Sequence, residues 1–304
     1  MTLYRESVTA KICAFSRAHH SMRKSSKIFD DNLAFDILGK KEYERIGQMI
    51  ENGFKNREYN PLSAFNKQFV SEEIEKYISP ITLSRAAFAE ESLLQFAEKK
   101  GACQYVICGA GMDTFPFRNE NRNIKIFELD YPDTQEYKLK KINELKWDIP
   151  SDVYYVPIDF SKDDMSIKLK EAGFSKDIPT FFSILGVTYY LTLSVFTKTL
   201  EMINEISSPE SEIVFDYPDE TTFAGKDNER VLRLRQIASG LGEIMKQGFS
   251  LNEIEEALKK SGFGIKKHLP PGEIQKTLRG RGYSQQAFEN IHLIKAVKGK
   301  EFKI

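Results

Sequence analysis

Hydrophobic and polar residues change their spacing about a third of the way along this chain. Up to about residue 100, apolar side chains recur at helical intervals, most regularly in 84–100, where Phe88, Leu93 and Phe96 share one side. This segment ends in two lysines and Gly101, a cationic last turn followed by a helix-stopping glycine. We therefore predict a helical N-terminal region, with helices over 9–18, 71–78 and 84–100.

After Gly101, short apolar runs alternate with amphipathic stretches. The runs typical of buried strands are 104–109, 124–130, 153–158, 179–185 and 211–216. The predicted helices between them are 132–146, 162–172 and 194–206. This alternation predicts an α/β fold with a mostly parallel sheet covered on both faces. Two later runs, 263–268 and 291–297, follow a helix over 250–261, and the return through a long polar loop is compatible with an antiparallel last strand.

The same patterns suggest a division of the chain into parts. We expect residues 1–100 to form a helical N-terminal extension or cap and residues 101–304 to form the ligand-binding core. The Gly- and Pro-containing stretch 217–249 interrupts the core pattern, and we interpret it as a lid insertion that contacts the substrate. The helix over 71–78 is expected to open with a capping box at Ser71.

Composition narrows the class of partner. Lys+Arg and Asp+Glu both count 44, so the basic excess of a nucleic-acid-binding protein is missing and a small-molecule or peptidic partner is favoured. No apolar run approaches the ~18 residues that cross a bilayer, so no membrane partner is expected. Three cysteines without paired spacing indicate the reducing cytoplasm, and four histidines without ligand spacing indicate no metal site.

The most informative segment joins a buried strand to a glycine turn. The run 105–108 ends in Gly109-Ala110-Gly111, where the backbone can approach a ligand without Cβ interference. The next strand ends in Glu128 and Asp130, about 20 residues after the glycines, a spacing at which a carboxylate meets ribose hydroxyls. The pair indicates an adenosine-containing cofactor.

Two cofactors compete for this turn. A nicotinamide dinucleotide favours a third glycine where Thr114 stands, and Asp113 would repel its pyrophosphate. S-Adenosylmethionine is cationic and carries no phosphate, so Asp113 suits it better. Asp159, at the end of the third strand, can accept from an adenine amino group while Phe160 covers the ring. The simpler alternatives are a tight strand–helix connection at the glycines and a helix cap at Asp159.

The hexapeptide Gly109–Thr114 and the segment Phe127–Pro132 closely resemble the leucine carboxyl methyltransferase family, which includes bacterial polyketide O-methyltransferases. The similarity continues through 156–160, 185–191 and 213–217. It implies a class I methyltransferase fold, Rossmann-like, with a seven-stranded sheet whose last strand is antiparallel, preceded by a helical extension. It also implies S-adenosylmethionine as the methyl donor.

The resemblance assigns roles residue by residue. It implies that Arg85 and Lys11 hold the donor's carboxylate, and that the turn at Gly109, with Ala110 and Gly111, passes under its methionine part. Asp130, near Glu128, takes the ribose, and Asp159 with Phe160 takes the adenine.

Leu185 departs from the family pattern. Many members carry a glutamate there, which faces the donor, so leucine removes a carboxylate able to hold the donor's ammonium group. Asp113 or a backbone carbonyl can substitute for it. The departure leaves open a non-catalytic S-adenosylmethionine-binding protein beside the methyltransferase and the nicotinamide oxidoreductase.

The acceptor is less specified. A carboxylate is ionised at neutral pH and needs no general base, whereas a hydroxyl benefits from one. The matched motifs contain no histidine, so an O-methyltransferase acting on a carboxylate is favoured over one acting on a hydroxyl. Candidate acceptor contacts are Arg17, Arg118, Tyr189, Tyr190 and Tyr217.

Overall fold

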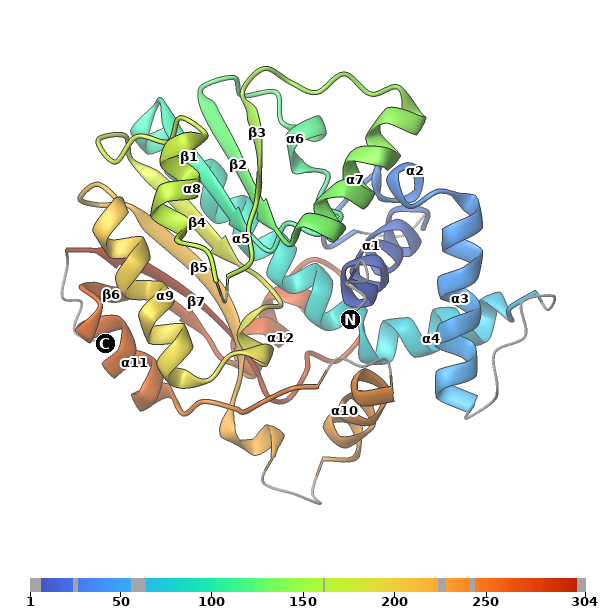
Figure 1. The fold of residues 1–304 in the computed structure, drawn as a ribbon. Coiled ribbons are helices and arrows are strands. Elements are labelled where there is room, and N and C mark those ends of the chain that lie inside the picture. The colour runs from blue at the N-terminus through green and yellow to red at the C-terminus, as the bar shows by residue number, and fades with distance from the viewer. Residues whose placement is uncertain are drawn as a thin grey trace.

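A computed structural model describes residues 7–23, 27–55, 64–160, 162–223, 228–240 and 244–299. Its centre is one seven-stranded sheet in the order β3-β2-β1-β4-β5-β7-β6 (Figure 1). The strands are β1 (Cys103–Cys108), β2 (Ile124–Asp130), β3 (Val153–Pro157), β4 (Thr180–Ile184), β5 (Glu212–Pro218), β6 (Phe263–Leu269) and β7 (Ile291–Lys298). Strands β1 to β5 are parallel, and β7 runs antiparallel to both of its neighbours. The predicted fold class is confirmed.

Helices cover both faces of the sheet, which is why its inner strands are apolar on both sides. On one face, Phe182 and Phe215 pack against Phe196 and Leu200 of α9 (Leu193–Ile206), beside α8 (Met165–Glu171) and α11 (Leu251–Lys260). On the other face, Phe181 and its neighbours pack against α5 (Ser79–Lys100) and α12 (Pro271–Gly280). Neighbouring residues of a strand point to opposite faces, so consecutive phenylalanines fill different layers.

The N-terminal helices form a third apolar cluster beside the sheet (Figure 1). They are α1 (Val8–Ser21), α2 (Ala34–Leu38), α3 (Lys40–Lys55) and α4 (Lys67–Tyr77). Phe15 of α1 stacks on Tyr43 of α3 with ring centroids 4.2 Å apart. The N–H of Ser7, the N-cap of α1, donates to Thr134 Oγ1 (3.3 Å) in the first turn of α7 (Pro132–Leu145). This contact anchors α1 beside the carboxyl ends of the parallel strands.

Three sequence predictions need correction. The helix expected to open at Ser71 begins four residues earlier, at Lys67, because the side chain of Asn66 accepts the N–H of Phe69 and caps it. The stretch around Pro270-Pro271 was expected to be a loop, but it opens α12, since proline in a first helical turn lacks an N–H that would be unpaired there. The strand predicted to end at 216 continues to Pro218 as β5, and the helix α10 (Glu229–Gly240) lies within the stretch 217–249.

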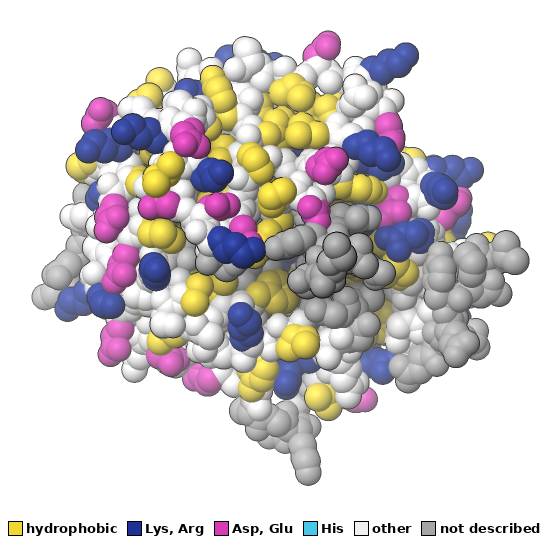
Figure 2. Space-filling view, viewed as in Figure 1, with side chains coloured by type: hydrophobic (Ala, Val, Ile, Leu, Met, Phe, Trp, Pro, Cys, Tyr) yellow, Lys and Arg dark blue, Asp and Glu magenta, His cyan; other side chains and the backbone are white. Residues whose placement is uncertain are grey.

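The surface agrees with the balanced composition. Figure 2 shows positive and negative side chains interspersed over the face of Figure 1. None of the described helices combines the length and the apolar character that crossing a membrane requires.

The cap of α11 offers a test of the local structure. The Ser250 hydroxyl accepts from the Glu253 N–H, and the Glu253 carboxylate accepts from the Ser250 N–H, as in a capping box. We expect Ser250→Ala to lower the free energy of unfolding by about 1 kcal/mol, and the control Ser250→Gly by only a few tenths, because glycine is itself tolerated at an N-cap. Urea unfolding midpoints measure both, and equal midpoints for Ser250→Ala and the parent would contradict the assignment.

Candidate functional site

A cavity of about 1060 Å³ lies at the carboxyl ends of the parallel strands. Its wall is formed by the ends of β1, β2 and β4, by the segment after β3, and by side chains of α1, α5 and α9. Strand order reverses between β1 and β4, and open α/β sheets bind ligands at this kind of switch point. The fold therefore places the cavity where a ligand is expected.

The glycine turn after β1 forms the floor of the cavity. Gly109 and Gly111 have φ of +80° and +52°, which L side chains rarely adopt. A Cβ on Gly109 would meet Val187 Cγ2 at 2.8 Å, and one on Gly111 would meet Ala10 Cβ at 2.9 Å. Glycine is therefore required at both positions, both by conformation and by the close approach of the neighbouring segments.

Asp130, at the end of β2, is fixed by this turn. Its carboxylate accepts the Gly111 N–H (2.5 Å) and the Tyr131 N–H (2.7 Å). Burial raises the pKa of Asp130, while these two hydrogen bonds oppose the rise. Each carboxylate oxygen can accept more than one hydrogen bond, so Asp130 can still accept from the hydroxyls of a ligand in the cavity.

The segment that follows β3 supplies Asp159 and Phe160 to the same cavity. Asp159 pairs with Lys162 (2.7 Å), and its backbone carbonyl accepts the N–H of Lys162 and of Asp163. It does not cap the following helix, because α8 begins at Met165 with Asp164 as its N-cap. The carboxylate of Asp159 thus remains at the cavity wall.

A buried carboxylate that the sequence analysis missed organises the end of β4. Asp216, in β5, accepts from Arg85 Nη1 (3.0 Å), from the Gly186 N–H (2.7 Å) and from the Tyr189 hydroxyl (2.7 Å). Its side chain is fully buried. Asp216 interrupts an otherwise apolar run, 213–217, and that interruption was the available sequence signal.

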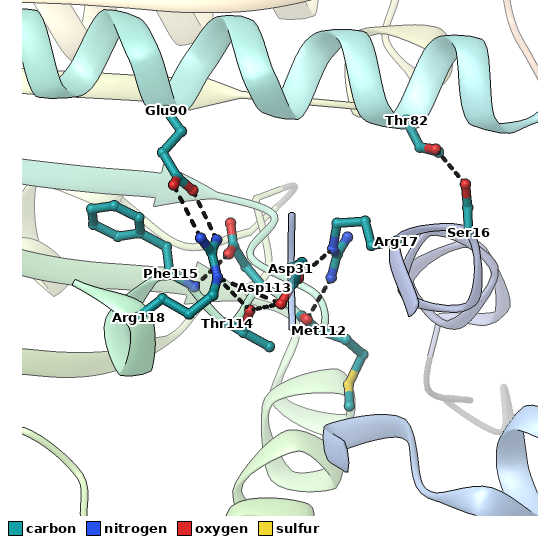
Figure 3. A network of polar contacts seen from close by, with 10 residues as sticks. All are labelled: Ser16, Arg17, Asp31, Thr82, Glu90, Met112, Asp113, Thr114, Phe115 and Arg118. Carbon is teal, nitrogen blue, oxygen red and sulfur yellow. Dashed lines mark hydrogen bonds and ion pairs between the residues drawn. The ribbon is translucent and has the colours of Figure 1, made fainter. Parts of the chain in front are cut away.

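A second network joins the N-terminal helices to the glycine turn (Figure 3). Asp31, buried between α1 and α2, pairs with Arg17 (2.8 Å) and accepts from the Thr114 hydroxyl (2.5 Å). Arg17 also donates to the carbonyl of Met112 (2.7 Å). Arg118 of α6 (Phe115–Arg118) lies 3.5 Å from Asp31 and donates twice to Glu90 of α5 (3.0 and 2.8 Å). No local sequence pattern pointed to Asp31 or Glu90.

Most of the predicted site residues meet at the cavity. Its lining includes Arg17, Arg85, Gly109, Ala110, Gly111, Asp113, Asp130, Asp159, Phe160, Leu185 and Tyr190. Five predicted residues lie outside the lining, namely Lys11, Arg118, Glu128, Tyr189 and Tyr217.

The side chain of each of those five contacts another residue of the protein. Lys11 pairs with Glu42 (3.0 Å) and lies over the ring of Tyr137, and Arg118 is held by Glu90. The Tyr189 hydroxyl donates to Asp216, and Tyr217 stacks on His292 with ring centroids 4.9 Å apart.

Glu128, in β2, is buried and in contact with α7. It forms a fully buried pair with Lys138 (2.6 Å). Burial raises the pKa of Glu128 and the charge of Lys138 opposes the rise. Its carboxylate is committed to that lysine and does not line the cavity.

The strand order, the antiparallel β7 and the glycine turn beside an acid define a class I methyltransferase. The chain belongs to the leucine carboxyl methyltransferase family, whose model matches residues 10–204. It is 38% identical over 96% of its length to YktD of Bacillus subtilis (strain 168), whose name describes an S-adenosyl-L-methionine-dependent methyltransferase and 98% of which is covered.

Solved structures agree on the fold. A DUF574 family protein from Streptomyces avermitilis matches with a TM-score of 0.55 and 14% identity, covering 83% of this chain and 96% of that one. The CurJ carbon methyltransferase matches with a TM-score of 0.51 and 12% identity, covering 87% and 66%. This protein is therefore an S-adenosylmethionine-dependent methyltransferase, and the nicotinamide and non-catalytic alternatives are set aside.

The residues of the cavity fit that donor. The glycine turn lines the cavity at Gly109, Ala110 and Gly111, and the anchored carboxylate of Asp130 suits a ribose diol. Asp113, in the cavity wall, suits a cationic ligand and disfavours a pyrophosphate. In the described ranges no cluster of three His, Cys, Asp or Glu side chains has the arrangement of a metal site.

The buried pair at Glu128 can be tested. We expect Lys138→Met to lower the free energy of unfolding by about 3–5 kcal/mol, because it leaves Glu128 buried without a counter-charge. The double variant Glu128→Leu/Lys138→Met removes both charges and should regain most of the loss. Urea unfolding measures both, and a Lys138→Met protein as stable as the parent would show that the pair has no structural role.

Proposed function

We propose that this enzyme transfers the methyl group of S-adenosylmethionine to an oxygen of a small-molecule or peptidic acceptor, and that this oxygen belongs to a carboxylate rather than to a hydroxyl. The observation that supports it is the character of the cavity wall near α9. Leu191, Val195 and Met202 are apolar there, and the exposed Lys198 and Lys246 are cationic. An acceptor with an apolar body and an anionic group suits this wall.

The protonation state of the acceptor supports the same choice. No histidine is among the described residues that line the cavity. A carboxylate is already ionised at neutral pH, whereas a phenol with a pKa near 10 needs a base to remove its proton. The lining residues therefore suit an acceptor that arrives ionised.

For the donor, we propose a placement across the strand ends. The glycine turn at Gly109, Ala110 and Gly111 lies under its methionine part, Asp130 accepts from the ribose hydroxyls, and Asp159 with Phe160 binds the adenine. Arg85 has N–H donors beyond those used by Asp216 and Cys13, and we assign it to the donor's carboxylate. Lys11 and Glu128 are left out, since both are committed elsewhere.

In this proposal, the residues of the protein mainly align the donor with the acceptor and shield both from water. When bound, S-adenosylmethionine supplies a methyl group already activated by its sulfonium centre. The glycine turn and Asp130 fix one reactant, while Lys198 and Lys246 attract the anionic group of the other. Alignment of two reactants and exclusion of water are the contributions that such a displacement needs from a protein.

We also propose that residues 1–100 act as a cap and 217–249 as a lid over the acceptor. Cap residues Ala10, Cys13 and Arg17 line the cavity, as does Lys246 of the lid. The backbone N–H of Lys246 donates to the Tyr189 carbonyl (2.9 Å), which joins the lid to the segment after β4. Arg17 and Tyr190 are the predicted acceptor residues that this arrangement retains.

The role of Asp130 can be tested by binding. We expect Asp130→Asn to weaken S-adenosylhomocysteine and 5′-methylthioadenosine about tenfold each, because both contain the ribose and the variant loses charge-assisted hydrogen bonds. Isothermal titration calorimetry measures both constants. Asp177→Asn, at an exposed loop position, is the matched control. Unchanged binding of 5′-methylthioadenosine by Asp130→Asn would refute the ribose assignment.

The acceptor class can be tested by the chemistry of the product. The enzyme is incubated with S-[methyl-³H]adenosylmethionine and matched acceptor pairs, such as alkyl and aryl carboxylic acids with their alcohols, and peptides with free or amidated C-termini. A methyl ester releases volatile [³H]methanol in alkali, whereas a methyl ether does not. We expect alkali-labile label on the acids alone. Alkali-stable label on the alcohols, or no label on any acid, would contradict a carboxylate acceptor.

A further inference from the structure

The charges around the α5 side of the cavity do not balance. Three carboxylates gather there, those of Asp31, Glu90 and Asp113, and they face two guanidinium groups, those of Arg17 and Arg118 (Figure 3). The nearby Arg85 does not correct the excess, because it is matched by the buried Asp216. This side of the cavity therefore carries one uncompensated negative charge.

The excess falls on Asp113 and Glu90, which both line the cavity. Asp113 accepts the N–H of Phe115 (2.8 Å) and forms no ion pair with any residue in the described part of the chain. Glu90 shares Arg118 with Asp31, and burial raises the pKa of Glu90, with Asp113 and Asp31 adding to the rise. Both carboxylates would gain from a cation that arrives in the cavity.

The donor brings such a cation. Its methionine part carries an ammonium group beside a carboxylate. At the end of β4, Leu185 packs against the apolar layer under α5, and the nearby carboxylate of Asp216 is already paired with Arg85. Arg85 and Glu90 lie five residues apart on α5, a rise of about 7.5 Å. Five residues also turn the helix by about 140°, yet both residues line the same cavity.

We propose that Glu90, together with Asp113, binds the ammonium group of the donor's methionine, so that α5 recognises both charged groups of the amino acid. Glu90 does so from a helix rather than from a strand end, and Arg118 holds its carboxylate through two hydrogen bonds. The proposal rests on the donor placement given above and is independent of the acceptor.

The test separates the ammonium from the rest of the donor. S-Adenosylhomocysteine has the ammonium and a neutral sulfur, S-adenosylmethionine adds the sulfonium charge, and 5′-methylthioadenosine lacks the amino acid. We expect Glu90→Gln to weaken the first two about tenfold each and to leave 5′-methylthioadenosine unchanged, as measured by calorimetry. Glu91→Gln, an exposed neighbour on α5 paired with Arg281, is the control and should change none of the three constants.

Each other pattern overturns the proposal. Weakening of S-adenosylmethionine alone would assign Glu90 to the sulfonium, and equal weakening of all three ligands would make its role structural. Unchanged binding of all three would remove Glu90 from the site. Failure of the parent protein to bind 5′-methylthioadenosine would instead refute the donor placement itself, and the ammonium assignment with it.

A second variant, Asp113→Asn, tests the proposal independently in case Glu90→Gln fails to fold. Asp113→Asn keeps an oxygen that can accept the N–H of Phe115 and removes only the charge. It should give the same split between S-adenosylhomocysteine and 5′-methylthioadenosine. Loss of both ligands alike, with an unchanged unfolding midpoint, would count against the proposal as strongly as no effect.

Discussion

The arrangement at the carboxyl edge of the sheet depends on the buried carboxylate of Asp216. Removing a carboxylate from water is costly, and the cost is offset here by Arg85, the Gly186 N–H and the Tyr189 hydroxyl. These donors come from α5, from the turn after β4 and from the segment that follows it. One side chain in β5 therefore fixes the relative positions of three separate parts of the cavity wall.

The backbone after β4 packs closely against the guanidinium group of Arg85. Gly186 has φ of +69°, and a Cβ at that position would lie 2.6 Å from Arg85 Nη2. The guanidinium thus lies directly against the main chain. The Asp31 network also joins separate segments through a buried ion pair. Arg17 of α1 pairs with Asp31 and donates a hydrogen bond to the carbonyl of Met112. Buried ion pairs, rather than apolar contacts alone, hold the helical extension to the glycine turn.

Local sequence patterns predicted those features of the structure that depend on residues close together in the chain. The strands and the glycine turn could be predicted because each depends on residues close in sequence. Asp130 could be predicted to lie near the turn because both lie at the ends of neighbouring strands of a parallel sheet. The roles of Asp216 and Asp31 could not be predicted, even though Asp216 interrupts an apolar run, because their partners Arg85 and Thr114 lie 131 and 83 positions away. Tyr189 was placed in the pocket by its motif, yet its hydroxyl turns to Asp216. Which way a polar side chain turns depends on contacts that no local pattern records.

The contact between α1 and the glycine turn has a consequence for redesign. Ala10 lies where a side chain on Gly111 would have to go, so the two positions share one small space. A bulkier residue at either would push the cap away from the floor of the cavity. Variants intended to accommodate larger compounds are therefore better made in α9, at exposed cavity-lining positions such as Val195 and Lys198. Substitutions there leave the contact between Ala10 and Gly111 unchanged.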